Sequence, residues 1–145
     1  MLTIYDTFLS NDGYQIVVAH ILFHLNDYMH ELGIAQSIMQ IVLSEAERAR
    51  ARKVLKVTVK VGELAGVLPD SLTFCFNLLA KSTIAEHALL TIEKVPIRGY
   101  CSQCESEFVI ADHRYCCTTC GNKHIELVSG RELQIGQLEI EDETD

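Results

Sequence analysis

Four cysteines in the last third of the chain are spaced to hold one metal ion. Cys101 and Cys104 form one CxxC pair, and Cys117 and Cys120 form a second pair after twelve intervening residues. Four thiolates on two tight turns can close a tetrahedral shell, and an all-sulfur shell with no open position is typical of a structural zinc site. Gly121, directly after the second pair, favours the tight turn that such a pair needs. The spacing therefore predicts a structural Zn²⁺ site.

Two other arrangements of the cysteines are open. A pair of disulfide bonds is less favoured, because the chain shows no secretory signal and cytosolic thiols stay reduced. Cys116 could replace Cys117, which would give a Cys-x₃-Cys pair with Cys120. We select Cys117 because its spacing repeats that of the first pair. Cys75 lies among apolar residues, and we expect it to be a buried core thiol.

Composition and charge narrow the class of protein. A chain of 145 residues with 48% hydrophobic and 22% charged residues is typical of one globular domain with a small insert. The net charge of −8 argues against a nucleic-acid partner, which would require a basic face. The longest apolar run, residues 16–25, contains two histidines and is too short to span a bilayer. We expect a cytoplasmic protein that binds neither nucleic acid nor membrane.

No pattern in the chain predicts an enzyme. The sequence contains no P-loop, no G-x-S-x-G motif and no HExxH motif. A zinc ion held by four cysteines has no open position for an activated water. We therefore expect a protein without catalytic activity.

Two helices are expected in the part of the chain that precedes the cysteines. Apolar residues recur at helical spacing over residues 32–50. A second helix is expected to begin at Pro69, which suits a first helical turn, and Asp70 would lie at its positive end. Lys81 is expected to end this helix. Its core face is predicted to consist of Leu72, Cys75, Phe76 and Leu79.

Strands are predicted at 54–61, 88–95, 124–128 and 133–141. In the first, alternating apolar residues predict one buried face, made by Leu55, Val57, Val59 and Val61. In the last, the apolar alternation slips near Gly136, which predicts a β-bulge.

This order of elements predicts an α+β fold, with a small β-sheet covered by two helices and an inserted Cys₄ zinc-ribbon lobe. The strands on both sides of the ribbon are expected to pair with each other. We divide the chain into an atypical extension (1–28), an α+β domain (29–96 plus 123–141), the zinc lobe (97–122) and an acidic tail (142–145).

The first 28 residues differ in pattern from the rest of the chain. Asn11, Asp12 and Gly13 form a turn signal. If residues 16–28 formed a helix, His20 and His24 would share one face, but histidines on an apolar stretch are more often packed or exposed than bound to metal. The segment is either a helical extension or not part of the native product.

Three separated motifs resemble the HypA/HybF family of hydrogenase-maturation nickel chaperones. They are Met-His-Glu-Leu at 29–32, Val-Lys-Val-Gly-Glu-Leu-Ala-Gly-Val at 59–67, and the late pair of CxxC motifs. Their order and spacing agree with the family, and the resemblance runs from Met29 to about Glu141.

The resemblance implies a small metallochaperone that carries Ni²⁺ as cargo. Its nickel residue would be His30, with Glu31 as a ligand or support and Met29 as the third member of the site, and its zinc ligands would be the four cysteines. The implied partners are a nickel-loading GTPase, the large subunit of nickel–iron hydrogenase and, in some organisms, urease maturation proteins; a homodimer is a further option. The alternatives are a zinc-ribbon adaptor without nickel and a thiol redox switch, which is weaker because zinc-bound thiolates are not free.

The position of the Met-His-Glu motif departs from the family pattern. Ni²⁺ favours square-planar or tetragonal sets of nitrogen and oxygen, and a free amine followed by a histidine supplies such donors. In this chain Met29 follows 28 residues and has no free amine. Either translation starts at Met29, which we favour, or His30 and Glu31 bind nickel with other donors such as His24 or His20.

Overall fold

The computed structural model of the protein describes residues 4–10, 13–21 and 31–142. Two helices, α1 (Glu31–Arg48) and α2 (Pro69–Ala80), lie within this part of the chain. The strands are β1 (Ile4–Ser10), β2 (Gly13–Ile21), β3 (Ala51–Gly62), β4 (Leu89–Val95), β5 (Arg98–Cys101), β6 (Ser106–Val109), β7 (Glu126–Ser129) and β8 (Leu133–Asp142). Neither described helix combines the length and the apolar character that crossing a bilayer would require.

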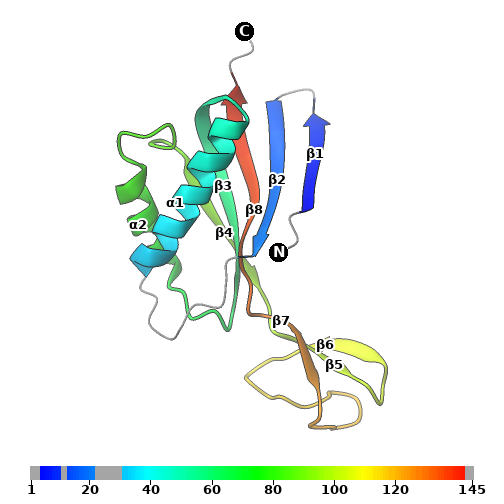
Figure 1. The fold of residues 1–145 in the computed structure, drawn as a ribbon. Helices are drawn as coiled ribbons and strands as arrows, with labels where there is room; N and C mark the ends of the chain where they lie inside the picture. Colours follow the sequence, from blue (N-terminus) through cyan, green and yellow to red (C-terminus); the bar gives the residue numbers. More distant parts are fainter. Residues whose placement is uncertain (1–3, 11–12, 22–30, 143–145) are drawn as a thin grey trace. The chain divides into compact units, whose positions relative to one another are not determined.

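The strands form two sheets. One has the order β1-β2-β8-β3-β4, and the other has the order β6-β5-β7. Both helices cover the same face of the larger sheet (Figure 1). The chain divides into two compact units, which we call the body (within residues 1–59, 67–92 and 134–145) and the lobe (60–66 and 93–133). The α+β fold expected from the sequence, with two helices on a small sheet and a separate four-cysteine lobe, is confirmed.

The core of the body forms between α1, α2 and the larger sheet. Helix α1 has an apolar stripe because small and aliphatic residues recur every three or four positions. The buried side chains of this stripe are Ile34, Ala35, Ile38, Met39, Val42 and Ala46. They face the sheet, where Val57, Val59, Ile135, Leu138 and Ile140 are buried.

The predicted alternation along β3 is wrong at its start. Leu55, expected in the core, is 48% exposed, whereas Val54 is buried. The backbone N–H of Val54 donates to the carbonyl of Ile84 at 2.9 Å, so this residue is held by a loop. From Val57 onward the alternation is also incomplete, because Thr58 is buried together with Val57 and Val59.

Helix α2 buries a narrower face than predicted. Leu72, Phe76 and Ala80 are buried, at a spacing of four residues. Cys75 is only half-buried, so the expectation that it is a buried core thiol is wrong. Cys75 directly precedes the buried Phe76 and therefore lies at the edge of the helix face that packs against the core.

The strands that flank the ribbon do not pair as predicted. In the larger sheet, β3 lies between β4 and β8, so these two strands are not neighbours. The strands that pair across the ribbon are instead β5, which follows β4, and β7, which precedes β8. They are antiparallel. β7 thus continues the lobe sheet to Ser129, beyond residue 122, where we placed the end of the lobe.

The predicted slip of the apolar pattern in β8 is present, although in the ladder with β2 the extra residue lies in β2. Ile135, Leu138 and Ile140 are buried, so the alternation slips by one residue between the first two. The ladder with β2 shifts at the same place: Ile16 pairs with Leu138, but His20 pairs with Ile135. Between these two pairs β2 advances by four positions and β8 by three, which is the signature of a bulge.

The part of the extension that the structure describes is not helical. β1 and β2 form an antiparallel hairpin, and β2 joins the larger sheet beside β8. A helix is therefore wrong for residues 16–21. Because His20 lies in β2, it does not contribute to a helical face with His24. His24 lies outside the described residues.

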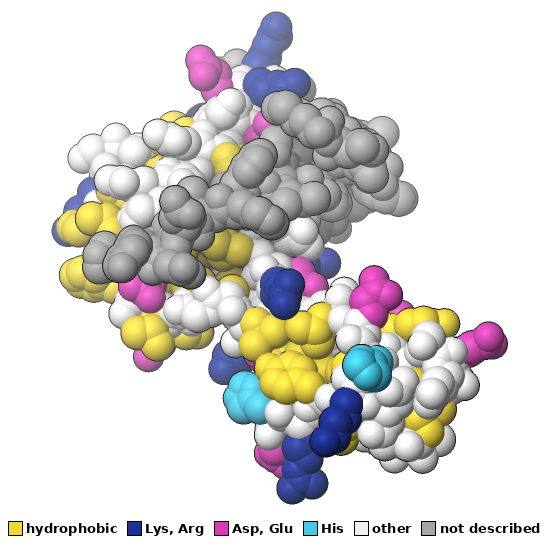
Figure 2. Space-filling model, turned by 60° about the horizontal axis from the view of Figure 1, so that its bottom comes forward, with side chains coloured by type: hydrophobic (Ala, Val, Ile, Leu, Met, Phe, Trp, Pro, Cys, Tyr) yellow, Lys and Arg dark blue, Asp and Glu magenta, His cyan; other side chains and the backbone are white. Residues whose placement is uncertain are grey.

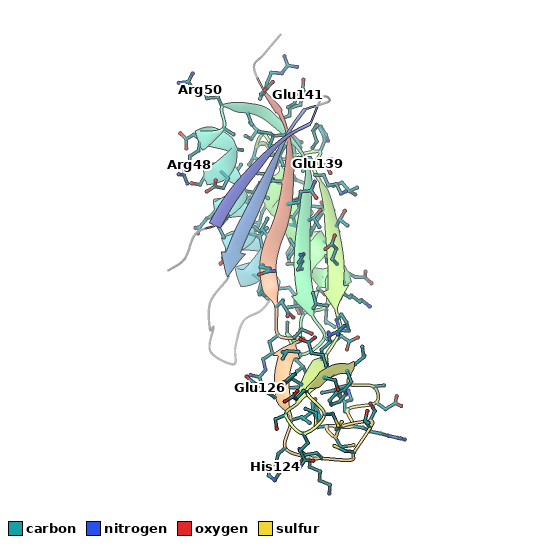
Figure 3. The ribbon with its side chains drawn as sticks, turned by 90° about the vertical axis from the view of Figure 1, so that its right-hand side faces the viewer. Arg48, Arg50, His124, Glu126, Glu139 and Glu141 are labelled. Atoms are coloured by element: carbon teal, nitrogen blue, oxygen red, sulfur yellow. The ribbon has the colours of Figure 1, made fainter. Side chains whose placement is uncertain are left out.

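Charged side chains line the exposed surface of β3 and β8. Lys56 and Glu139 form an ion pair of 3.4 Å, and Arg52 pairs with Glu141. Glu139 and Glu141 project from β8 in Figure 3. Such solvent-exposed pairs contribute little stability, although they disfavour a shifted register between the two strands.

The lobe contains a close backbone approach between Gly62 and Gly130. A Cβ atom on Gly62 would lie 2.2 Å from the carbonyl carbon of Gly130. The Gly62 N–H donates to Glu132 O at 2.7 Å, and the Leu64 N–H donates to Gly130 O at 2.7 Å. The Glu63 carboxylate accepts from the Ile97 N–H at 3.3 Å, directly before β5. The Gly-Glu-Leu segment of the second motif therefore ties together the chain segments that enter and leave the lobe.

We predict that Gly62→Ala destabilises the protein by about 3 kcal/mol, because the new methyl group would overlap rigid backbone. Gly33→Ala is the matched control. Its site in α1 has no atom within 4 Å of an added Cβ, so replacing a helical glycine should stabilise by about 1 kcal/mol. Urea unfolding followed by circular dichroism measures both changes. Equal stability of the Gly62→Ala variant and the unchanged protein would contradict the packing described.

Candidate metal centre

The structure brings the four predicted cysteines of the lobe together. The Sγ atoms of Cys101, Cys104, Cys117 and Cys120 all lie within 4.8 Å of one another. Cys101 Sγ is 3.7 Å from Cys120 Sγ, and Cys117 Sγ is 3.8 Å from Cys104 Sγ. A tetrahedron of sulfurs around Zn²⁺ has edges of about 3.8 Å, whereas a disulfide requires about 2.05 Å. The cluster fits one tetrahedral metal ion, and all six cysteines of the chain are free thiols.

Two tight turns position the sulfurs. The first pair occupies the turn between β5 and β6, where Cys101 pairs with Ser106. The second pair lies in the long connection from β6 to β7. The residue after each pair has a left-handed backbone, with φ of 49° at Glu105 and 75° at Gly121. The sequence indicates the second turn through its glycine, whereas Glu105 gives no such signal.

The first cysteine of each pair is buried, and the second faces outward. Cys101 and Cys117 are buried, Cys104 is half-buried and Cys120 is exposed. The Cys117 N–H donates to Asn122 O at 2.8 Å, and the Gly121 N–H donates to Cys117 O at 2.9 Å. These bonds close the second turn on itself, so its sulfurs are held without help from the body.

The environment of the thiols sets the order in which they ionise. The Cys120 side chain, together with burial, raises the pKa of Cys104 from 9.0 to about 12. The backbone N–H groups of Cys120 and Thr119 lower the pKa of Cys117 from 9.0 to about 6, because these donors stabilise its thiolate. The backbone around Cys117 therefore favours the thiolate form, which is the form that binds a metal ion.

Two polar side chains beside the cluster were not predicted from the sequence. Asn122 Nδ2 lies 4.0 Å from Cys101 Sγ and also donates to His124 O at 3.2 Å. Gln103 Oε1 lies 3.6 Å from Cys120 Sγ. The Asn122 amide nitrogen can donate to the Cys101 sulfur and offset the negative charge of a four-thiolate site, whereas the Gln103 oxygen accepts from the Cys120 thiol. Their only sequence signal is their place within or directly after a CxxC pair.

Three other residues near the pairs are not members of the cluster. Cys117, and not Cys116, supplies the third sulfur. His113 and His124, which lie beside the pairs in the sequence, are also not among the four grouped residues. Figure 3 labels His124 in the lobe, together with Glu126 on β7.

Of the three residues expected to bind nickel, the structure describes only Glu31. Met29 and His30 are outside the described residues. Glu31 is the first residue of α1, and its Oε1 accepts from the Leu68 N–H at 3.3 Å, directly before α2. A shallow hollow of about 480 Å³ lies beside Glu31 and is lined by Glu31, Leu32, Asp70, Ser71, Phe74 and Cys75. The carboxylate of Glu31 is thus held at the rim of an open depression on the body.

We predict that Cys117→Ser removes the bound metal from the lobe, whereas Cys116→Ser leaves one metal ion per chain. The reason is that only Cys117 belongs to the sulfur cluster. Elemental analysis of the purified proteins measures the difference. Full metal content in Cys117→Ser, or loss in Cys116→Ser, would contradict the ligand set.

Acidification is expected to release this metal. All four sulfurs bind a metal ion as thiolates, so protons compete with the ion and displace it as the pH falls. The lowered pKa of Cys117 delays this loss, because its thiolate persists to lower pH than an ordinary cysteine's. A chelating dye that changes colour with released metal should report retention at neutral pH and release in the acid range. Release that is already complete at neutral pH would refute this order.

Comparison with known proteins identifies the family. The model of the family described as "Hydrogenase/urease nickel incorporation, metallochaperone, hypA" matches residues 29–140. The chain is 42% identical to hydrogenase maturation factor HypA of Geobacter metallireducens, over 78% of this chain and 100% of that protein. It is 44% identical to hydrogenase maturation factor HypA of Chlorobium phaeobacteroides, with the same two coverages of 78% and 100%.

Solved structures agree on the fold. The solution structure of the Ni metallochaperone HypA from Helicobacter pylori superimposes with a TM-score of 0.58 at 24% identity, covering 79% of this chain and 100% of that one. The extension, residues 1–28, lies outside the family match. From Met29 onward, the chain belongs to the HypA family of hydrogenase and urease nickel-incorporation metallochaperones.

Proposed function

We propose that this protein binds Ni²⁺ as cargo and delivers it during the maturation of nickel–iron hydrogenase. The observation that carries this proposal is the family match over residues 29–140, which begins at the Met-His-Glu motif and includes all four clustered cysteines. The relatives that match over their full length are named hydrogenase maturation factors. The family has a carrier role, and we propose no catalytic activity for this chain.

The nickel site that we propose consists of His30, Glu31 and Met29. The imidazole of His30 and the backbone nitrogens around it are the donors that Ni²⁺ prefers. The contact of Glu31 with the Leu68 N–H supports a role for its carboxylate, because it fixes that group beside an open hollow. An exposed and incomplete shell suits a carrier, since a recipient must be able to take the metal.

The extension determines the character of this site. A free amine at Met29 would complete a tetragonal set of nitrogens, whereas an amide in a longer chain is a far weaker donor. We therefore propose that the functional protein begins at Met29. If residues 1–28 are present, His20 and His24 are the side chains that would have to replace the amine.

For the four-cysteine cluster we propose Zn²⁺ with a structural role. The spacing of the sulfurs fits a tetrahedral ion, and the closed shell leaves no site for a substrate or water. Metal binding supplies folding free energy to small lobes of this kind. The domain division that we propose separates the nickel segment at the start of α1 from this structural lobe.

The proposed partners follow from the same role. They are a nickel-loading GTPase, the large subunit of nickel–iron hydrogenase and urease maturation proteins, all met in the cytoplasm. A zinc-ribbon adaptor without nickel is not favoured, because the family match extends over the α+β body as well as the lobe.

The test is the metal content of His30→Ala. We expect loss of tight Ni²⁺ binding with one zinc retained per chain, because the imidazole is the main nickel donor and lies apart from the cysteines in the sequence. His124→Ala, which alters an exposed histidine of the lobe, is the matched control and should keep both metals. Equilibrium dialysis against Ni²⁺ with elemental analysis measures both. Nickel binding that persists in His30→Ala would overturn the proposed site.

A further inference from the structure

Strand β8 has an outer edge that only the extension covers in the described part of the chain. It lies between β2 and β3, and β2 belongs to the hairpin with β1 (Figure 1). The family match begins at Met29, and the solved Helicobacter structure is covered over 100% of its chain by 79% of this one, so the fold forms without the extension. In a chain that begins at Met29, β8 is therefore the edge strand of a sheet with the order β8-β3-β4.

This edge lacks the side chains with which proteins commonly block an exposed strand. Lysine, proline and inward-pointing charges are the usual means. Residues 133–138 contain no charge and no proline, and the whole of the ten-residue strand β8 contains no lysine. Glu139 and Glu141 are acidic, but they pair with Lys56 and Arg52 of β3. An edge of this kind presents a row of N–H and C=O groups to a further strand.

Strand β2 occupies this edge imperfectly. Ile16 pairs with Leu138 and His20 pairs with Ile135, so the register shifts between the two pairs. A bulge leaves one residue unpaired and disrupts the ladder of hydrogen bonds. A strand without the extra residue would pair continuously with β8, which makes β2 a replaceable occupant.

We propose that the outer edge of β8 is a docking site for an extended segment of a partner protein, which adds to the sheet antiparallel to β8. The direction is that of β2, which is antiparallel to β8. The chemistry also follows from β2, because it contains no Lys, Arg, Asp, Glu or Pro and is rich in Val and Ile. Ile135, Leu138 and Ile140 of β8 are buried in the core. An uncharged, β-branched segment therefore extends both the sheet and this apolar face.

The extension and the partner segment compete for the same edge. A tethered strand acts at a high effective concentration, so β2 blocks the partner segment in the full chain. The inference rests on the proposed start at Met29, because only a chain that begins there leaves the edge open. It does not depend on nickel. Since its tests follow peptide binding to the zinc-loaded protein, a failure of strand addition and a failure of nickel binding are separate results.

The first test measures the binding of a labelled synthetic peptide, residues 13–21, by fluorescence anisotropy. Its targets are the shorter protein, which begins at Met29, and the full chain. We expect saturable binding to the shorter protein and a dissociation constant at least about tenfold higher for the full chain, because β2 already fills its edge. The absence of saturable binding to the shorter protein, or equal binding to both proteins, would overturn the proposal.

A peptide with two prolines is the control for apolar adhesion elsewhere. Figure 2 shows exposed hydrophobic side chains (yellow) on the body, to which an apolar peptide could adhere without forming a strand. Successive N–H groups of a strand point to opposite edges, so one of the two at Val17 and Val18 faces β8. Val17→Pro and Val18→Pro together should therefore abolish binding of the peptide to the shorter protein. Undiminished binding would contradict strand addition.

A peptide with the same nine residues in reverse order tests whether the site accepts a foreign segment. Main-chain hydrogen bonds supply most of the affinity in strand addition, so the reversed peptide should bind the shorter protein within about tenfold of the native one. Binding of the native order alone would mean that the edge fits the extension only, which would overturn the proposed partner.

Hydrogen exchange locates the bound peptide. Amide protons of β8 residues 134–139, the stretch that pairs with β2, should exchange faster in the shorter protein than in the full chain. The peptide should restore their protection. Strand β7, which pairs with β5 in the lobe, is the internal control and should not change. Protection that appears elsewhere and not in β8 would refute the proposed edge.

Discussion

The requirement that four thiolates converge on one ion shapes the lobe. Small units of this size have little apolar core, and the buried residues of the lobe include two of the cysteines themselves, beside Ile97 and Ile110. Each CxxC pair needs a tight turn with a left-handed residue after it, and Glu105 and Gly121 supply these turns. The β5–β6 hairpin then follows from the first turn, and the pairing of β5 with β7 closes the sheet around the second. The turns that bring the four sulfurs together therefore also determine how the strands of the lobe pair.

In the body, the first turn of α1 lies at an accessible surface, where Leu32 is exposed and Glu31 is half-buried. The apolar stripe of α1 packs against the sheet along its length, which leaves the first turn of the helix at the edge of the core. The contact between Glu31 and the Leu68 N–H then links the beginnings of the two helices. A carrier needs a binding group that is fixed in place but not enclosed, and the first turn of a well-packed helix offers this combination. A buried and complete shell would hold the metal too firmly to release it to a recipient.

The sequence predicts those features that depend on local pattern and fails where tertiary packing decides. The cysteine spacing, the two helices, the position of Pro69 at a helix start and the slipped alternation of β8 are readable because each follows from residues close in the chain. The position of β3 between β4 and β8 cannot be predicted from the sequence, since no residue pattern in these strands indicates which strand each will pair with. Leu55 is misplaced because Val54, whose N–H donates to the loop carbonyl of Ile84, is the buried residue at this point of β3. Cys75 is misplaced because α2 buries only Leu72, Phe76 and Ala80, although apolar residues also occupy the positions beside them. The two amide side chains beside the cluster become visible only when the sulfurs are brought together.

The central claim is that this chain is a nickel carrier whose site is built at Met29, His30 and Glu31. The most direct measurement is a calorimetric Ni²⁺ titration of two zinc-loaded proteins, one beginning at Met1 and one beginning at Met29. The account predicts one tight nickel site per chain in the shorter protein and weaker binding in the longer one, because only the shorter protein offers a free amine next to His30. The absence of specific nickel binding from both proteins would contradict it.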